Sequence, residues 1–415
     1  MNFIKRLYHW SREKTDQFLL QLCREDKLWL AVPLSSLARK FFLREFSVKQ
    51  VNYRNIEELK QLVIKATKEQ AAKPADAQGK PSISLGFKVL MIFPKYRNDW
   101  KDRVETNFEN TWAMTAKDTG LNVDIFYADR ISYLPPDASN LEMMSQEGRK
   151  LLCKVKEFRP QLIFLDINYL GNQNTINFNL IQDIKNIHNC KIVGYMGDYY
   201  SKEAFRIAEY WSKSLDKVFY GEPGKTSGNL HNVHYLHFFV NEKSFYPFSE
   251  RGNDITFSGS GNISRYVYLA FTKSLAQKKG YTCEIHLHNN SINSALSSEE
   301  YSRLIRESRA VLNLSARAAP GVRVVTGRVQ QAIASKSLLI EEKNESVARI
   351  FTPYAHYIPF DSREELAIAI DFSVNCGELV DKITEAAYTK YRREHSSQVV
   401  WNQILRLCNV SSQKV

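Results

Sequence analysis

The sequence predicts an α/β protein with two tandem domains, each built around a doubly wound parallel sheet. Over most of the chain, short apolar and β-branched runs alternate with longer amphipathic stretches, which is the pattern of repeated βα units. The 415 residues suffice for two to three domains at roughly 100 to 200 residues each. An apolar fraction of 44% and a charged fraction of 25% are typical of a folded globular protein and exclude a disordered or fibrous one.

The chain opens with an extra region that we expect to be helical, basic and amphipathic over residues 1–65. Its first 50 residues carry ten lysines and arginines against five aspartates and glutamates, interleaved with large apolar side chains. This pattern suits two arrangements: shallow binding to an anionic membrane surface, or helices that pack on the next domain and keep a solvated charged face. Residues 66–84 have no aromatic side chain but contain Pro74, Gly79 and Pro81, which is typical of a linker.

Residues 85–248 are expected to form the first Rossmann-like domain. Its predicted strands are 88–93, 123–127, 162–167, 191–195, 217–220 and 233–236. Helical periodicity fills stretches between them, at about 107–119, 145–158, 179–187 and 202–214. Six strands with helices between them are enough for one doubly wound domain.

A second set of strands follows a break near 247–253 and predicts a second Rossmann-like domain over 249–375. Its predicted strands are 254–258, 282–287, 310–314, 337–341 and 355–359. Helices are expected near 264–279, 298–308, 328–335 and 362–372. The remaining residues, 376–415, have the pattern of a C-terminal helical tail that is broken near His395.

The net charge indicates what kind of partner to expect, and the cysteines indicate the cellular compartment. The formal net charge is +12, so the surface should attract anions such as phosphates or acidic lipid headgroups. No apolar run reaches the roughly 18 residues of a membrane span, and Arg6, Arg12 and Lys14 interrupt any signal-peptide core. Six scattered cysteines without a CxxC pair indicate reduced thiols, hence a cytoplasmic protein without disulfides or structural zinc.

Open parallel sheets bind ligands beyond the carboxyl ends of their strands, so the loops after the strands are the places to search for a site. After the strand 254–258 come Gly259, Gly261 and then Arg265. Small residues there let backbone N–H groups approach a phosphate at a helix N-terminus, and an arginine would pair with it. A plain strand-to-helix turn is equally compatible with these residues.

Three further arginines lie in or just after the loop 315–327: Arg317, Arg323 and Arg328. The loop follows an apolar strand and leads into the helix expected at 328–335. Uncompensated arginines that converge on a helix N-terminus suit a diphosphate. We therefore assign these residues to a candidate phosphate site.

Two other motifs are weak. The run 221–226 (GEPGKT) is similar to a nucleotide-binding P-loop, but Phe219 stands where that loop requires glycine, so we interpret it as a strand-end turn. His231, His234 and His237 recur every third residue; on a strand this spacing alternates faces, so at most two could share a metal. We expect no metal site.

Two carboxylates, Asp166 and Asp198, follow predicted strands of the first domain. A carboxylate at that edge is placed where catalytic groups lie, although many such residues only bond the backbone. Asp198 is our candidate catalytic residue, because it follows the apolar strand 191–195 at the carboxyl edge of the first sheet, where ligands of open parallel sheets bind.

Taken together, the second half of the chain resembles the glycosyltransferases of the GT-B fold, and within them the group of the spore-maturation protein CgeB. Residues 232–405 fit this pattern well, whereas the first domain fits by its strand rhythm and the run 193–198 (VGYMGD). The matching stretches are 235–236, 240–241, 245–247, 254–259 with Arg265, 301–314, 328–341 and the pair His395 and Trp401.

The resemblance implies a nucleotide-activated sugar as donor, held mainly by the second domain, and an acceptor on the first. Its expected donor-binding residues are Gly259, Arg265, Arg317, Arg323, Arg328 and Gln331. Arginines or a helix dipole can neutralise the leaving diphosphate without a metal or other cofactor. One departure stands out: Gln331 and Lys336 occupy positions where the family usually has glutamate and glycine. The amide can still bond a ribose hydroxyl.

Two functions follow as hypotheses. The first is a hexosyltransferase-like enzyme that transfers a sugar to a glycan or cell-surface polysaccharide precursor, with a glycan or lipid-linked acceptor, working in the cytoplasm or peripherally at the inner membrane face through residues 1–50. The alternative is a catalytically silent GT-B relative that acts as an anion-binding or partner-binding scaffold. A nucleic-acid partner is not expected, because no recognised binding motif is present.

Overall fold

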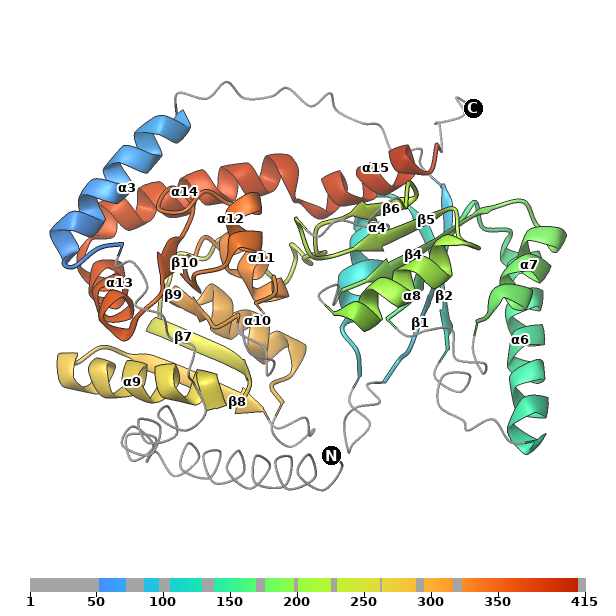
Figure 1. The fold of residues 1–415 in the computed structure, drawn as a ribbon, viewed down its shortest axis with the longest axis horizontal. Coiled ribbons are helices and arrows are strands. Elements are labelled where there is room, and N and C mark those ends of the chain that lie inside the picture. Colours follow the sequence, from blue (N-terminus) through green and yellow to red (C-terminus); the bar gives the residue numbers. More distant parts are fainter. Residues whose placement is uncertain are drawn as a thin grey trace. The chain divides into compact units, whose positions relative to one another are not determined.

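The structure is a computed structural model that describes residues 52–71, 86–96, 105–128, 138–168, 176–197, 201–224, 230–261, 263–288, 295–315 and 323–409. The chain divides into two compact units (Figure 1). The six-strand unit comprises the described residues from Gly86 to Lys243 and from Lys390 to Asn409. The five-strand unit consists of Ser244–Thr389 together with an N-terminal helix.

The six-strand unit is built on one parallel sheet with the strand order β2-β1-β3-β4-β5-β6. The strands are β1 (Lys88–Phe93), β2 (Asn122–Tyr127), β3 (Leu162–Asp166), β4 (Lys191–Met196), β5 (Lys217–Tyr220) and β6 (Val233–Tyr235). From β1 the chain moves first to one side and then to the other. The topological switch point therefore lies between β1 and β3, where such sheets bind ligands.

Each face of this sheet has its own apolar core, since neighbouring residues of a strand point to opposite faces. On one face, Ile163 and Leu165 of β3 pack with α6 (Ala138–Phe158), α7 (Phe178–Ile187) and α8 (Lys202–Ser212). On the other, Leu162 and Phe164 pack with the π-helix η2 (Glu109–Ala113), α4 (Met114–Asp118) and α15 (Ser397–Leu407). The last helix of the chain is thus part of the six-strand unit.

The five-strand unit is also a parallel sheet, with the order β11-β10-β9-β7-β8. Its strands are β7 (Asn253–Ser260), β8 (Cys283–His288), β9 (Ser308–Asn313), β10 (Leu338–Glu342) and β11 (Ile358–Phe360). Its helices are α9 (Ile263–Lys279), α10 (Ser298–Arg306), α11 (Gly327–Ala334), α12 (Glu345–Ile350), α13 (Arg363–Asn375) and α14 (Gly377–Glu394).

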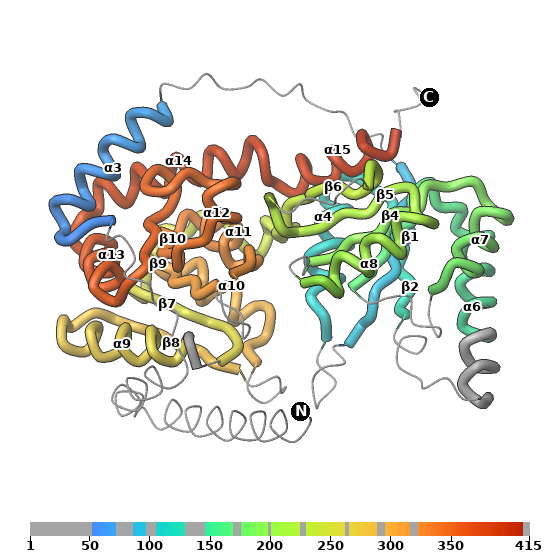
Figure 2. Tube along the Cα trace, viewed as in Figure 1, coloured from blue at the N-terminus to red at the C-terminus, as the bar shows by residue number. Residues whose placement is uncertain are grey.

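An N-terminal helix, α3 (Ile56–Ala71), completes the core of the five-strand unit. Figure 2 shows it, in blue, beside α13 and α14, in red. Leu59 and Val63 are fully buried in the same apolar cluster as α9, α13 and α14. Just before the helix, the Tyr53 hydroxyl lies 3.0 Å from the carbonyl of Pro359 and 3.1 Å from that of Glu365. The helix is therefore an integral part of this unit.

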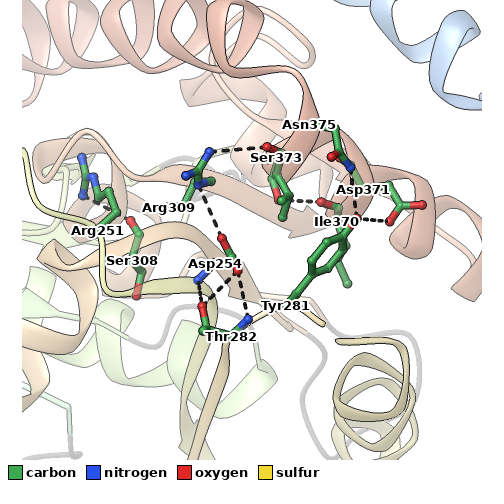
Figure 3. A network of polar contacts seen from close by, with 11 residues as sticks. Arg251, Asp254, Tyr281, Thr282, Ser308, Arg309, Ile370, Asp371, Ser373 and Asn375 are labelled. Carbon is green, nitrogen blue, oxygen red and sulfur yellow. Dashed lines mark hydrogen bonds and ion pairs between the residues drawn. The ribbon is translucent and has the colours of Figure 1, made fainter. Parts of the chain in front are cut away.

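The amino edge of the five-strand sheet, where its strands begin, is fastened by polar contacts (Figure 3). Arg251 donates to the carbonyls of Ser308, Ser335 and Lys336 at 3.1 to 3.2 Å, and to that of Arg306. Asp254 accepts hydrogen bonds from the backbone and hydroxyl of Thr282 at 2.9 and 3.0 Å. These contacts tie strand starts to helix ends, opposite the edge that can hold a ligand.

The predicted α/β class with two parallel sheets is confirmed, with local differences. Helix α3 runs to Ala71, so the linker expected from residue 66 begins inside a helix. The strand expected at 355–359 begins only at Ile358, because Tyr354 has a positive φ of 63° and its N–H bonds the carbonyl of Tyr357, which makes a turn there. The break in the C-terminal helical tail is confirmed, between α14 and α15. Helix α12 was not foreseen.

Candidate functional site

Polar side chains gather at the carboxyl edge of the five-strand sheet, on the face that α10 and α11 cover. Along β7, β9 and β10, apolar residues such as Phe257, Leu312 and Ile340 point into the core shared with α9 and α13. Ser258, Asn313 and Glu341 come next along these strands, and they are all buried. Because side chains alternate between faces, these three point to the opposite face. A buried parallel sheet is usually apolar on both faces, so this polar patch needs partners.

Asn313 is the centre of the resulting hydrogen-bond network. Its amide nitrogen donates to Glu341 Oε2 at 2.6 Å, and β9 and β10 place the two residues side by side in register. Its carbonyl oxygen accepts from the Thr326 hydroxyl at 3.0 Å and from the Arg328 guanidinium at 2.5 Å. The network therefore joins two strand ends to the start of α11.

Arg328, in the first turn of α11, lies at this edge as predicted but is bound to the protein. Besides Asn313, its guanidinium donates to the carbonyl of Ser258 and lies over the Phe257 ring at 4.7 Å. A Cβ added to Gly259 would lie 2.6 Å from Arg328 Nη2. Glycine at 259 is thus required for the close approach of the arginine to the end of β7.

Arg265 also anchors the backbone of the predicted site. Its Nε donates to the carbonyl of Leu314 at 3.1 Å, and its Nη1 donates to the carbonyl and hydroxyl of Ser260 at 2.8 and 2.9 Å. It is 5% exposed. Arg265 therefore holds the ends of β7 and β9 together.

Arg323 is the more accessible arginine of the site. Its guanidinium contacts Glu342 Oε1 at 3.2 Å, and its side chain is 29% exposed. A partly exposed ion pair of this kind can exchange its carboxylate for another anion at modest cost. Of the three described arginines, Arg323 is the one that can turn toward a ligand.

Helix α11 presents its N-terminus at the same edge. The N-cap residue, Thr326, bonds Asn313 and makes no side-chain cap of the helix. Gly327 follows as the first helical residue. The N–H groups of an uncapped first turn, together with the helix dipole, favour an anion in front of the helix.

Gln331, one turn further along α11, is paired with Tyr301 of α10. The Tyr301 hydroxyl donates to Gln331 Oε1 at 2.7 Å. Burial raises the pKa of Tyr301, and the charge of Arg328 and a hydrogen bond from it oppose that rise. Since arginine can only donate, the phenol oxygen accepts from Arg328 and its proton points to Gln331. This leaves the amide N–H₂ of Gln331 as the group available to a ligand.

Glu341 is the buried acid of the network. It is 0% exposed, and burial raises its pKa to about 8, with smaller opposing contributions from the hydrogen bond to Asn313 and the charge of Arg328. Below that pH the carboxyl is neutral, which suits its place between apolar strands. Its oxygen Oε2 still accepts from Asn313, so the site keeps its geometry with the acid protonated.

Two residues of the predicted site cannot be compared with the structure. Arg317 and Asp198 are outside the described residues. Sequence reasoning missed Asn313, Glu341, Tyr301 and Thr326. Alternation could have identified the first two, because each interrupts an apolar strand at its carboxyl end. No spacing of residues in the sequence indicates that Tyr301 pairs with Gln331.

The described parts of the chain contain no group of three or more histidine, cysteine, aspartate or glutamate side chains placed to hold a metal ion. In the six-strand unit, His237 is bound to the hydroxyl of Tyr235 at 2.8 Å and stacks edge-on against His395 at 3.9 Å between ring centroids. Burial lowers the pKa of His237 to about 4. None of the helices within the described ranges combines the length and apolarity that a membrane span requires.

Comparison with known families identifies the segment that carries the site. Residues 253–406 match the model of a family described as glycosyl transferase-like. The match covers this segment of the five-strand unit and its C-terminal continuation, and not the rest of the chain. Every residue of the Asn313 network lies within it. A search of the curated proteins finds no match.

Solved structures of glycosyltransferases share the fold. A glycosyltransferase from Rickettsia africae aligns with a TM-score of 0.53 at 12% identity, over 80% of this chain and 100% of that chain. Sucrose-phosphate synthase from Thermosynechococcus elongatus aligns with a TM-score of 0.52 at 10% identity, over 78% and 100%. At these identities the likeness shows the fold alone, which is GT-B.

The likeness to these structures confirms the predicted GT-B fold, and the match of residues 253–406 to a glycosyl transferase-like family agrees with the predicted class of protein. The finer resemblance to the CgeB group stays a prediction. Within residues 253–406, the carboxyl edge of the five-strand sheet combines an uncapped helix start, arginines and a glycine at a strand end, which is the chemistry of an anion site.

Proposed function

We propose that the protein transfers a sugar from a nucleotide-activated donor to an acceptor hydroxyl, and that the donor's diphosphate binds at the carboxyl edge of the five-strand sheet. The observation that carries this proposal is the convergence of Arg323, Arg328 and the uncapped start of α11 on one edge. The edge lies within residues 253–406, which match the glycosyl transferase-like family.

The chemistry of sugar transfer explains why such an edge is suited to the task. The bond between the anomeric carbon and the diphosphate breaks with its electron pair on the leaving group, so negative charge grows on the diphosphate. Fixed N–H donors and guanidinium groups that already point to that position stabilise the growing charge. A helix N-terminus supplies the same effect through its dipole. No metal is needed in this proposal.

The three described arginines have different roles in this proposal. Arg265 and Arg328 shape the site, because their guanidinium groups hold the backbone of the β7 and β9 ends in place. Arg323 makes the direct contact: the diphosphate replaces Glu342 as its partner. Gln331 offers an amide N–H to the donor, since its carbonyl oxygen accepts the proton of Tyr301.

The finer assignments belong to the same proposal. Resemblance to the CgeB group supports a glycan or lipid-linked acceptor that is a precursor of a cell-surface polysaccharide. The basic, aromatic composition of residues 1–50 supports work at the inner face of an anionic membrane.

Calorimetric titration of the full chain with UDP-, GDP- and CMP-activated sugars, in the presence of a chelator, tests the proposal. We expect saturable heat with one donor class and a tenfold to hundredfold weaker affinity in Arg323→Ala, since a charge-assisted hydrogen bond is worth about 1.5 to 3 kcal/mol. Arg303→Ala is the matched control, because Arg303 is an exposed arginine of α10. No saturable heat with any donor would favour the catalytically silent relative instead.

A further inference from the structure

The side chain of Gln331 lies against the start of α11, one turn before its own position on the helix. A Cβ added to Gly327, the first helical residue, would lie 3.8 Å from Gln331 Nε2 and 4.0 Å from its Oε1. The amide is therefore folded back toward the helix N-terminus, where Thr326 makes no side-chain cap. Gly327 and Gln331 are both partly exposed, so a ligand in front of α11 can reach this amide.

A chain of hydrogen bonds that starts at Arg328 sets the direction of the amide. Arg328 is held by Asn313 and by the carbonyl of Ser258. Burial raises the pKa of Tyr301, and the charge of Arg328 and its hydrogen bond to the phenol oppose the rise. A guanidinium can only donate, so the phenol oxygen accepts from it and turns its own proton to Gln331 Oε1, 2.7 Å away. The amide nitrogen of Gln331 then faces away from Tyr301.

Tyr301 is itself held in place by its surroundings. It lies on α10, which begins with a capping box between Ser297 and Glu300 and lies beside α11 (Figure 1). The buried ring of Phe245 meets the Tyr301 ring edge-on, with 5.9 Å between the ring centroids. A side chain that is fixed by packing can in turn fix the orientation of a polar group that it bonds.

The orientation of the amide decides which ligand atom it can meet. The nitrogen of Gln331 can only donate, so its partner must be an acceptor. A phosphate oxygen suits this position, because it carries negative charge and no proton. A ribose hydroxyl can also accept, but its own proton then needs a further partner. The backbone N–H groups and the dipole at the start of α11 favour the phosphate as well.

We propose that Gln331 binds a phosphate oxygen of the donor, and that Tyr301 is the positioning residue that turns the amide nitrogen toward it. This inference rests on the proposed function and makes it more specific. At this position the site recognises the diphosphate and is insensitive to the ribose hydroxyls. Selection among nucleosides must then come from other contacts.

Calorimetric titration of the full chain and of Gln331→Ala tests which part of the ligand Gln331 binds. The two ligands are the nucleoside diphosphate of the donor that the panel selects and its 2′,3′-dideoxy analogue. We expect Gln331→Ala to weaken the binding of both by the same factor, about tenfold, because both keep the diphosphate. A larger loss for the ribonucleotide than for the dideoxy analogue would mean that Gln331 binds the ribose, and would overturn the inference, as would no loss for either.

Gln331→Glu tests the requirement for a donor while it keeps the shape of the side chain. It turns a negatively charged acceptor toward the ligand, so we expect both nucleotides to bind more than about tenfold more weakly. Gln277→Glu is the matched control, because it adds the same charge at an exposed glutamine of α9 in the same unit. The control should bind as wild type does. Unchanged or tighter binding by Gln331→Glu would overturn the inference.

Tyr301→Phe tests the positioning role, because it keeps the ring and lets the amide turn over. We expect affinity for the nucleoside diphosphate to fall by about twofold to tenfold. In the Gln331→Ala background the same substitution should have no effect, since Tyr301 acts through the amide. A loss that persists in that background would mean that Tyr301 acts through Arg328 or packing, and would overturn its positioning role. A full chain that gives no saturable heat with any nucleoside diphosphate or activated sugar would instead overturn the proposed function, and this inference with it.

Discussion

At the scale of single residues, the proposed donor site depends on the buried carboxyl of Glu341. Glu341 bonds Asn313, and Asn313 in turn holds Arg328 and Thr326 at the start of α11. Burial raises the pKa of Glu341 to about 8. Its charge state is therefore linked to folding, because the unfolded chain releases this proton near pH 4.5.

We expect Glu341→Gln to become progressively more stable than wild type as the pH rises from about 4.5 to 8. In that window the folded wild-type chain keeps a proton that the unfolded chain has lost, so its free energy of unfolding falls with pH, by on the order of 1 kcal/mol per pH unit. The glutamine has no such proton. Urea unfolding of both chains across this range is the measurement, and parallel stability curves would contradict the pKa of Glu341.

The residues of the site were only partly predictable from the sequence. Sequence order alone was enough to find Gly259, Arg265, Arg323 and Arg328, because each follows a predicted strand. Their roles could not: whether a guanidinium binds a ligand or the carbonyl of Ser258 depends on which strand ends meet. Asn313 and Glu341 were missed because they are distant in sequence and adjacent only across β9 and β10.

At the scale of elements, one arginine at the amino edge of the five-strand sheet serves two helix ends. Arg251 reaches the carbonyl of Arg306 at the end of α10 and those of Ser335 and Lys336 after α11. The last carbonyls of a helix have no intrahelical partner, so the guanidinium supplies what the helices lack. The position of α11, and with it the proposed donor site at the N-terminus of this helix, depends on this contact.

Arg251→Ala should lower the free energy of unfolding by roughly 2 to 4 kcal/mol, since several buried carbonyls lose a charged donor. Chemical denaturation is the measurement. Arg303→Ala, on the exposed face of α10, should change stability by no more than about 0.5 kcal/mol. Equal effects of the two substitutions would mean that the contacts of Arg251 do not stabilise the helix ends.

Elements were predicted more reliably than their ends. The strands of both sheets follow from apolar, β-branched runs, which burial on two faces requires. The end of α3 was misplaced because residues 66–71 are polar and lie on a helix of which few side chains are buried. The six-residue helix α12 was missed because it is too short to show a helical period.

At the scale of the whole molecule, α3 belongs to the core of the five-strand unit, whereas residues 1–50 are the segment proposed to bind a membrane. Leu59 and Val63 are buried in the core of the five-strand unit, and Tyr53 bonds the end of β11. Any role of residues 1–50 at a membrane must therefore be tested without removing α3.

A chain that starts at Gly86 should be much less stable than one that starts at Val51. Loss of Tyr53, Leu59 and Val63 exposes their apolar partners, at about 1.5 to 3 kcal/mol for each large side chain. Thermal unfolding of the two truncated chains measures the difference. Equal melting temperatures would show that α3 does not contribute to the five-strand unit.

The chain that starts at Val51 also tests the proposed membrane binding, by comparison with the full chain. The full chain should sediment with phosphatidylglycerol vesicles, because each basic residue near an anionic surface contributes about 1 kcal/mol. The chain that starts at Val51 keeps α3 and should stay in the supernatant. If both sediment equally, residues 1–50 do not carry the attraction.

The central claim is that the donor's diphosphate binds where β7, β9 and α11 meet. A crystal structure of the protein soaked with the donor that gives saturable heat tests it most directly. We predict density for the diphosphate in front of the first turn of α11, within hydrogen-bond distance of Arg323 and beside Gly259. Density for the donor at any other place, with this edge empty, would contradict the account.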